Sequence, residues 1–131
     1  MDSAVASIVR DTAAASNEGR MHFGQVVGAL LGAGIESYSV DYRARRTTYY
    51  VPTGETLTVD HPDMDVTIEQ DFSAEGIKAA ILGAQRGELM YPQFKHLSQL
   101  AGCIGYTVWL TGRHVSYFGR RGEVHIEPFP N

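Results

Sequence analysis

The spacing of apolar residues changes from a helical period to an alternating one, and the change occurs twice along the chain. A first helix is predicted after Asp2 and Ser3, either of which can cap it, and it ends at Gly19. A second apolar stripe at helical spacing follows and closes at Gly34. Apolar and polar residues then alternate, as they do in half-buried strands. The three predicted strands cover residues 37–42, 47–51 and 57–59.

The same succession of patterns returns in the second half. Ser73 is a suitable N-cap for a third helix, which ends at Gly87, and Pro92 suits the first turn of a fourth. The apolar stripe of the fourth helix consists of Phe94, Leu97, Leu100 and Ala101. Three more strands are predicted at residues 104–110, 114–118 and 123–127. The acidic stretch 61–71 between the halves is predicted to be a connector with a short strand at 66–68.

A constant shift of 68 positions relates the two halves without a gap. The aligned pairs include Gly19 with Gly87, Gly34 with Gly102, Tyr38 with Tyr106, Arg45 with Arg113, Tyr49 with Tyr117 and Gly54 with Gly122. We therefore expect one domain, residues 1–131, built from two repeats (about 5–59 and 73–127) joined by the acidic connector. Each repeat is a helix–helix–three-strand unit, so the predicted fold class is α+β, with four helices covering antiparallel strands. One joined sheet with the helices on one face is preferred to two stacked sheets.

The last strand departs from this alignment. Leu57 and Val59 align with His125 and Glu127, out of phase with the apolar pair Val124 and Ile126. A one-residue difference in the last turn is the expected explanation, because it would bring the two apolar pairs back into phase.

Composition narrows the class of protein. Hydrophobic residues make up 44% and charged residues 20% of the 131, which is typical of a folded globular protein. The net charge of -4 argues against nucleic acid and anionic membranes as partners. The longest uncharged apolar stretch, residues 21–35, is shorter than a spanning helix needs, and the start lacks the basic region of a secretory signal. With a single cysteine in addition, a cytoplasmic protein is expected.

Several glycine, tyrosine and arginine spacings carry a family resemblance. They include Ala33-Gly34-Ile35 with Tyr38 and Val40-Asp41, Ala101-Gly102-Cys103 with Gly105-Tyr106, and Gly112-Arg113 with Val115, Tyr117 and Gly119-Arg120. In these features the chain resembles the YbcV-like family of small uncharacterised bacterial and phage proteins, some labelled phage envelope protein. It departs at Gly24, where the family more often has proline. The resemblance implies no activity and no site residues, and the phage label would imply a virion-associated ancestry.

Arginines and aromatic residues lie at equivalent places in the two halves. If a twofold axis relates the repeats, Arg45 and Arg113 meet across it, together with Tyr49 and Tyr117. Guanidinium groups and aromatic faces bind anionic and planar ligands, so these four are the candidate ligand-binding residues. The alternative is that the arginines are solvated and the tyrosines only pack the sheet.

The histidines offer weaker candidates. None of the five forms a close metal-binding pair and Cys103 has no partner thiol, so no metal site and no cofactor are expected. His61 follows Asp60 and is either a base in a loop or part of a solvated turn. His125 is expected beside Glu123 and Glu127, on the strand face opposite Val124 and Ile126. There it is either an acid–base group or a residue of the wet face of the sheet.

The leading hypothesis is a binding or interaction protein, expected as a homodimer, for a small anionic ligand. An enzyme using His125 or His61 on such a substrate is the second hypothesis, although the sequence leans away from enzymes. A structural role in a phage particle is the third. The ligand, any reaction, the oligomeric state and the pathway are beyond what the sequence defines.

Overall fold

Each half of the chain folds as two helices followed by three strands, in an α+β fold. The computed structural model describes residues 1–130. The first half contains α1 (Ser3–Asn17), α2 (Phe23–Gly32), β1 (Ser37–Asp41), β2 (Arg46–Tyr50) and β3 (Thr56–Asp60). The second half contains α3 (Ala74–Gln85), α4 (Tyr91–Leu100), β4 (Cys103–Trp109), β5 (His114–Gly119) and β6 (Val124–Pro128). The four helices and six strands predicted within the two repeats are thus all present.

The helices begin at the predicted caps. The Asp2 carboxylate accepts a hydrogen bond from the Ala4 amide at 2.7 Å, and the Ser73 hydroxyl accepts one from the Gly76 amide at 3.0 Å. These bonds satisfy amides that the first helical turn leaves without partners.

Residues with positive φ mark the equivalent turns of the two halves. Within residues 1–130, every such residue has a counterpart 68 positions away. Arg45 and Arg113 are the two that are not glycine, with φ values of 56° and 60°. The glycine pairs are Gly19 with Gly87, Gly34 with Gly102, and Gly54 with Gly122. The backbone therefore turns in the same way at the same places in both halves.

The six strands form one antiparallel sheet in the order β3-β2-β1-β4-β5-β6. The two halves join through β1 and β4, with Ser39 directly opposite Thr107. Of the two arrangements considered from sequence, the joined sheet is therefore the one that occurs.

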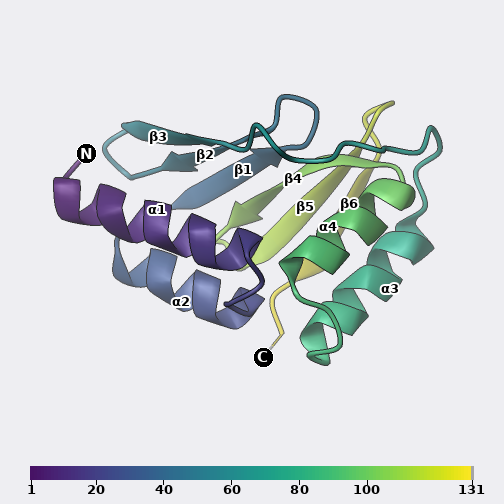
Figure 1. Ribbon diagram of the computed structural model, residues 1–131, viewed down its shortest axis with the longest axis horizontal. Helices are drawn as coiled ribbons and strands as arrows, with labels where there is room; N and C mark the ends of the chain where they lie inside the picture. The colour runs from purple at the N-terminus through teal and green to yellow at the C-terminus, as the bar shows by residue number, and fades with distance from the viewer. Residues whose placement is uncertain (131) are drawn as a thin grey trace.

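All four helices cover one face of this sheet, as α1 with α2 and α3 with α4, and the C-terminal tail runs between the pairs (Figure 1). Buried side chains such as Tyr38, Tyr49, Tyr106 and Tyr117 form the core beneath the helices. Within residues 1–130, no helix combines the length and the apolar character that crossing a bilayer requires.

The buried face of α4 matches the predicted stripe at Phe94 and Ala101 but not at its two leucines. Leu97 and Leu100 are 39% and 41% exposed, whereas Ser98 and Gln99 are buried. The Tyr42 hydroxyl bonds the Ser98 hydroxyl at 2.8 Å, which in turn donates to the Lys95 carbonyl. Polar partners in the core, invisible to a pattern of apolar spacing, thus rotate the helix away from its leucines.

Gln99 also explains why the expected strand at 66–68 does not form. Its side chain accepts a hydrogen bond from the Thr67 amide at 2.8 Å and donates to the Asp65 carbonyl at 3.4 Å. The Glu69 amide bonds the Gln99 carbonyl at 3.0 Å. Since α4 supplies these backbone partners, the connector is held as an irregular segment without a strand partner.

The expected one-residue difference in the last turn is wrong. Tyr49 faces Leu57 in the β2–β3 pair, and Tyr117 faces His125 in the β5–β6 pair, so the shift of 68 continues to the end of the sheet. His125 and Glu127 therefore share the helix-covered face with Tyr117. The apolar side chains of Val124 and Ile126, 50% and 58% exposed, lie on the open face.

Candidate functional site

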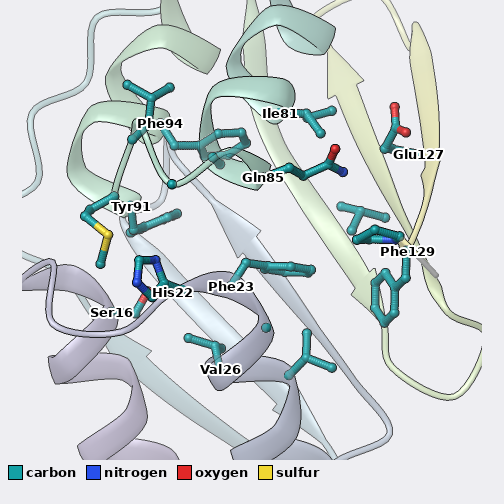
Figure 2. Close-up of a pocket in the computed structure, with 18 of the residues that line it drawn as sticks. Ser16, His22, Phe23, Val26, Ile81, Gln85, Tyr91, Phe94, Glu127 and Phe129 are labelled. Carbon is teal, nitrogen blue, oxygen red and sulfur yellow. The ribbon is translucent and has the colours of Figure 1, made fainter.

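A pocket of about 620 Å³ lies between the two helix pairs, over the β4–β6 part of the sheet. Figure 2 shows side chains from α1, α2, α3, α4 and the end of β6 around it. Six aromatic residues provide much of its wall: Phe23, Tyr91, Phe94, Tyr106, Tyr117 and Phe129. A pocket of this size with an aromatic lining is typical of sites for small organic molecules.

The aromatic rings of the wall contact one another in edge-to-face, tilted and stacked pairs. Phe23 of α2 meets Phe129 of the tail with ring centres 5.6 Å apart at 81°. Tyr106 and Tyr117 are 5.5 Å apart at 45°. The Tyr106 hydroxyl donates to the Tyr91 hydroxyl at 2.9 Å, and burial raises the pKa of Tyr91 to about 12. These phenols therefore stay protonated near neutral pH and act as hydrogen-bonding groups.

Arg113 brings a positive charge to this pocket. Its guanidinium lies over the Phe129 ring, 5.5 Å from the ring centre. Its carbonyl accepts a hydrogen bond from the Phe129 amide at 3.0 Å, which fixes the tail beside the β4–β5 turn. Among residues 1–130, Arg113 forms no ion pair with a carboxylate. The guanidinium therefore has free donors for an anion.

A carboxylate and an imidazole stand on the same side of the sheet. The Nε2 of His125 and an oxygen of Glu127 are 3.1 Å apart, and Glu127 lines the pocket. The His125 ring stacks against Tyr117 with centres 6.3 Å apart. Of the two carboxylates expected beside His125, Glu127 contacts it, whereas the Glu123 side chain accepts a hydrogen bond from the Arg121 amide. The face that carries His125 and Glu127 is the helix-covered one and not the open one.

Arg45 and Tyr49, the first-half candidates, do not reach this pocket. Arg45 is exposed at the β1–β2 turn and donates through Nε to the Met64 carbonyl at 3.1 Å. Tyr49 is buried and stacks on Tyr38 at 5.3 Å. Because β1 and β4 are antiparallel, their following turns lie at opposite ends of the sheet, beyond strand ends that are roughly 14 Å apart along the strands. The expected meeting of Arg45 with Arg113 across the axis therefore does not occur.

A much smaller cavity of about 30 Å³ occupies the equivalent place in the first half. His61 fills it, bonded to the Thr47 hydroxyl at 2.8 Å and to the Asn17 amide nitrogen at 3.3 Å. The residue 68 positions after His61 is Phe129. The His61 amide donates to the Arg45 carbonyl, as the Phe129 amide does to the Arg113 carbonyl. His61 is thus a half-buried packing residue with satisfied ring nitrogens, which differs from both the solvated turn and the loop base considered from sequence.

The sequence did not single out Glu127 or the aromatic wall as a site. The sequence contained one indication of this site: at the shift of 68, the polar residues His125 and Glu127 align with the apolar residues Leu57 and Val59. A strand shifted by one residue explains the same mismatch equally well. Within residues 1–130, no three histidine, cysteine or acidic side chains gather as a metal ion would require.

Comparison with curated proteins gives no match. A family model described as "Protein of unknown function (DUF1398)" matches residues 12–128, which include both helix pairs and nearly all of the sheet. That description names no activity or ligand. The chain belongs to this family of proteins of unknown function.

Proposed function

We propose that the protein binds a small molecule with a planar apolar body and an anionic group in the pocket between the helix pairs. The observation that carries the proposal is the aromatic cavity of about 620 Å³ with the Arg113 guanidinium at its wall. Aromatic faces favour a planar body, and a guanidinium favours a carboxylate, sulfonate or phosphate. Arg86, exposed at the end of α3, adds a second positive charge to the lining.

The energetics give each part of the pocket a separate role. A bicyclic aromatic body removes roughly 150 Å² of apolar surface from water, a gross contribution of about 4 kcal/mol. Lost freedom on association offsets much of this. The hydrogen bonds from Arg113 to an anion, worth roughly 1.5–3 kcal/mol, then supply the preference for charged over neutral ligands.

Calorimetry with aryl carboxylates and their matched primary amides tests the proposal. Arg113→Gln is expected to weaken carboxylate binding about tenfold and to leave amide binding unchanged. Arg45→Gln is the matched control, because Arg45 has the same backbone conformation at the equivalent turn but lies outside the pocket. Equal losses in the two variants, or no binding of any aryl probe, would contradict the proposal.

One observation favours a second candidate, an enzyme acting on the same class of molecule. The His125–Glu127 hydrogen bond joins an imidazole to a carboxylate that shares the pocket with Arg113. A general acid–base pair requires such a contact. NMR spectra of a bound probe, followed over hours, distinguish the two: a binding protein returns the probe unchanged.

We also propose that residues 5–59 and 73–127 are two copies of one ancestral unit. The support is the constant shift of 68 in the positive-φ residues and in the strand registers. Superposition of the halves in a crystal structure tests this. The YbcV-like resemblance and its phage label add no ligand chemistry to the proposal.

The homodimer expected from sequence stays a prediction. The exposed apolar side chains of Trp109, Val124 and Ile126 on the open sheet face are the surface that a second copy would cover. Light scattering coupled to size exclusion gives the oligomeric state directly.

A further inference from the structure

We propose that Glu127, positioned by His125, is a second anchor of the pocket and selects ligands that carry an ammonium group beside their anionic group. This inference rests on the proposed function and narrows its ligand to a zwitterion with a large apolar body, such as an aromatic amino acid. The carrying feature is an acid–imidazole pair at two strand positions where the first half has Leu57 and Val59.

Glu127 occupies a position where the fold itself favours an apolar side chain. The equivalent residues of the first half are Leu57 and Val59, which pack against the core. His125 and Glu127 replace them at the same registers, facing Tyr117 and Val115. A carboxylate on an apolar face costs stability unless hydrogen bonds compensate for lost water. The replacement therefore points to a role other than packing.

The pair is only half satisfied by the protein. His125, whose side chain is 12% exposed, bonds one Glu127 oxygen at 3.1 Å, and the Glu127 side chain is 31% exposed. Within residues 1–130, the other Glu127 oxygen has no hydrogen-bond partner. The imidazole thus orients the carboxylate and leaves one oxygen for a donor that enters the pocket.

Arg113 and Glu127 present opposite charges to the same space. Both residues line the pocket, and Arg113 lies over the ring of Phe129, two residues after Glu127. Figure 2 shows Glu127 and Phe129 at the β6 side of the pocket, with Gln85 of α3 reaching toward them. No ion pair joins Arg113 to Glu127 among the described side chains. A zwitterion that places its carboxylate at Arg113 and its ammonium at Glu127 would pair both charges.

Three probes with one indole body test the inference by calorimetry or NMR titration. L-tryptophan carries both charged groups, indole-3-propionate only the acid and tryptamine only the amine. The native protein is expected to bind tryptophan about tenfold more tightly than indole-3-propionate. In Glu127→Gln this preference is lost, while indole-3-propionate binds at least as tightly as before.

The chain supplies a second variant that guards against misfolding. The double variant His125→Leu, Glu127→Val installs the residues that the first half already carries at these registers, and it is expected to fold and to lose the same preference. His125→Leu alone tests the positioning role. The ratio of tryptophan affinity to indole-3-propionate affinity is expected to decrease, while the affinity for indole-3-propionate itself is retained. Glu88→Gln is the matched control, because this exposed carboxylate follows α3 and lies outside the pocket lining.

The outcomes separate the inference from the function on which it rests. If indole-3-propionate binds as tightly as tryptophan and Glu127→Gln changes neither, Glu127 is no anchor, although the pocket still binds anions. An equal effect of Glu88→Gln would likewise overturn the inference, because the preference would then follow the overall charge. If none of the three probes binds, the pocket proposal fails together with it.

Discussion

The side-chain oxygens of Ser39 and Thr107 lie 2.9 Å apart across the central strand pair, and the two residues are 68 positions apart in the chain. They are directly opposite each other in the β1–β4 pair, which joins the two halves. Ser39 therefore pairs with the residue that the shift of 68 makes its equivalent. On the helix-covered face, the pocket of about 620 Å³ in the second half and the cavity of about 30 Å³ in the first half share Tyr91 and Tyr106 in their linings.

Removal of one side of this hydrogen bond should destabilise the protein modestly. Ser39→Ala and Thr107→Val are each expected to lower the free energy of unfolding by about 0.5–1.5 kcal/mol, because each leaves the remaining hydroxyl without its partner. The double variant should cost less than the sum, since no unpaired hydroxyl remains. Urea unfolding of the four proteins measures the coupling, and strictly additive losses would argue against a direct hydrogen bond.

The regular features of the fold followed from local patterns. Caps such as Asp2 and Ser73, and glycines such as Gly34 and Gly102, act within one turn of the chain. They can therefore be predicted from sequence without knowledge of tertiary contacts. A joined sheet was preferred from sequence and is confirmed, whereas its junction between β1 and β4 is known only from the structure.

The failures concern positions where a distant partner decides the outcome. Ser98 and Gln99 are buried because Tyr42 and the connector meet them there, and no spacing rule contains those partners. Arg45 and Arg113 were expected to meet, but the antiparallel junction sends their turns to opposite ends of the sheet. The pocket itself arises from a difference between two equivalent places, one filled by His61 and the other open beside Phe129.

Gln99 should hold the connector through its side chain. Gln99→Leu is expected to cost about 0.5–1.5 kcal/mol, because it leaves the Thr67 amide without its acceptor in a part-buried hydrogen bond. Amide hydrogen exchange of Thr67 should accelerate in this variant. The Glu69 amide bonds the backbone carbonyl of Gln99 and serves as the internal reference, since its protection should be retained. Faster exchange at both amides would instead indicate that α4 itself is disturbed.

Gly28 offers a test of the helix that lines the pocket. It lies inside α2, and a Cβ added there would meet nothing within 4 Å. Gly28→Ala is therefore expected to raise the free energy of unfolding by about 0.5–1 kcal/mol through reduced backbone freedom in the unfolded chain. Gly105→Ala should do the reverse, because its Cβ would lie 2.2 Å from the Val40 carbonyl oxygen at the sheet junction. Thermal or urea unfolding compares the two, and a loss of stability in Gly28→Ala would contradict the open surroundings.

His61 should make stability depend on pH. Burial, reinforced by the Lys95 ammonium, lowers the pKa of His61 below its ordinary 6.5, while Asp60 opposes the shift. The unfolded chain therefore takes up this proton at a higher pH than the folded chain, and the folded state loses stability as the pH falls from about 6.5 through the lowered pKa. Above that range the imidazole is neutral in both states, and the full contribution is present.

The structural reason for this pH dependence is the bond to Asn17. The Asn17 amide nitrogen can donate only to an unprotonated Nδ1, so protonation of the ring sets two donors against each other at 3.3 Å. Unfolding free energies at about pH 7.5 and about pH 5.5 should fall less on acidification in His61→Gln than in the native chain. His96→Gln, on the exposed side of α4, should show the native fall. If His61→Gln loses as much stability on acidification as the native chain, a group other than the His61 imidazole is responsible for the pH dependence.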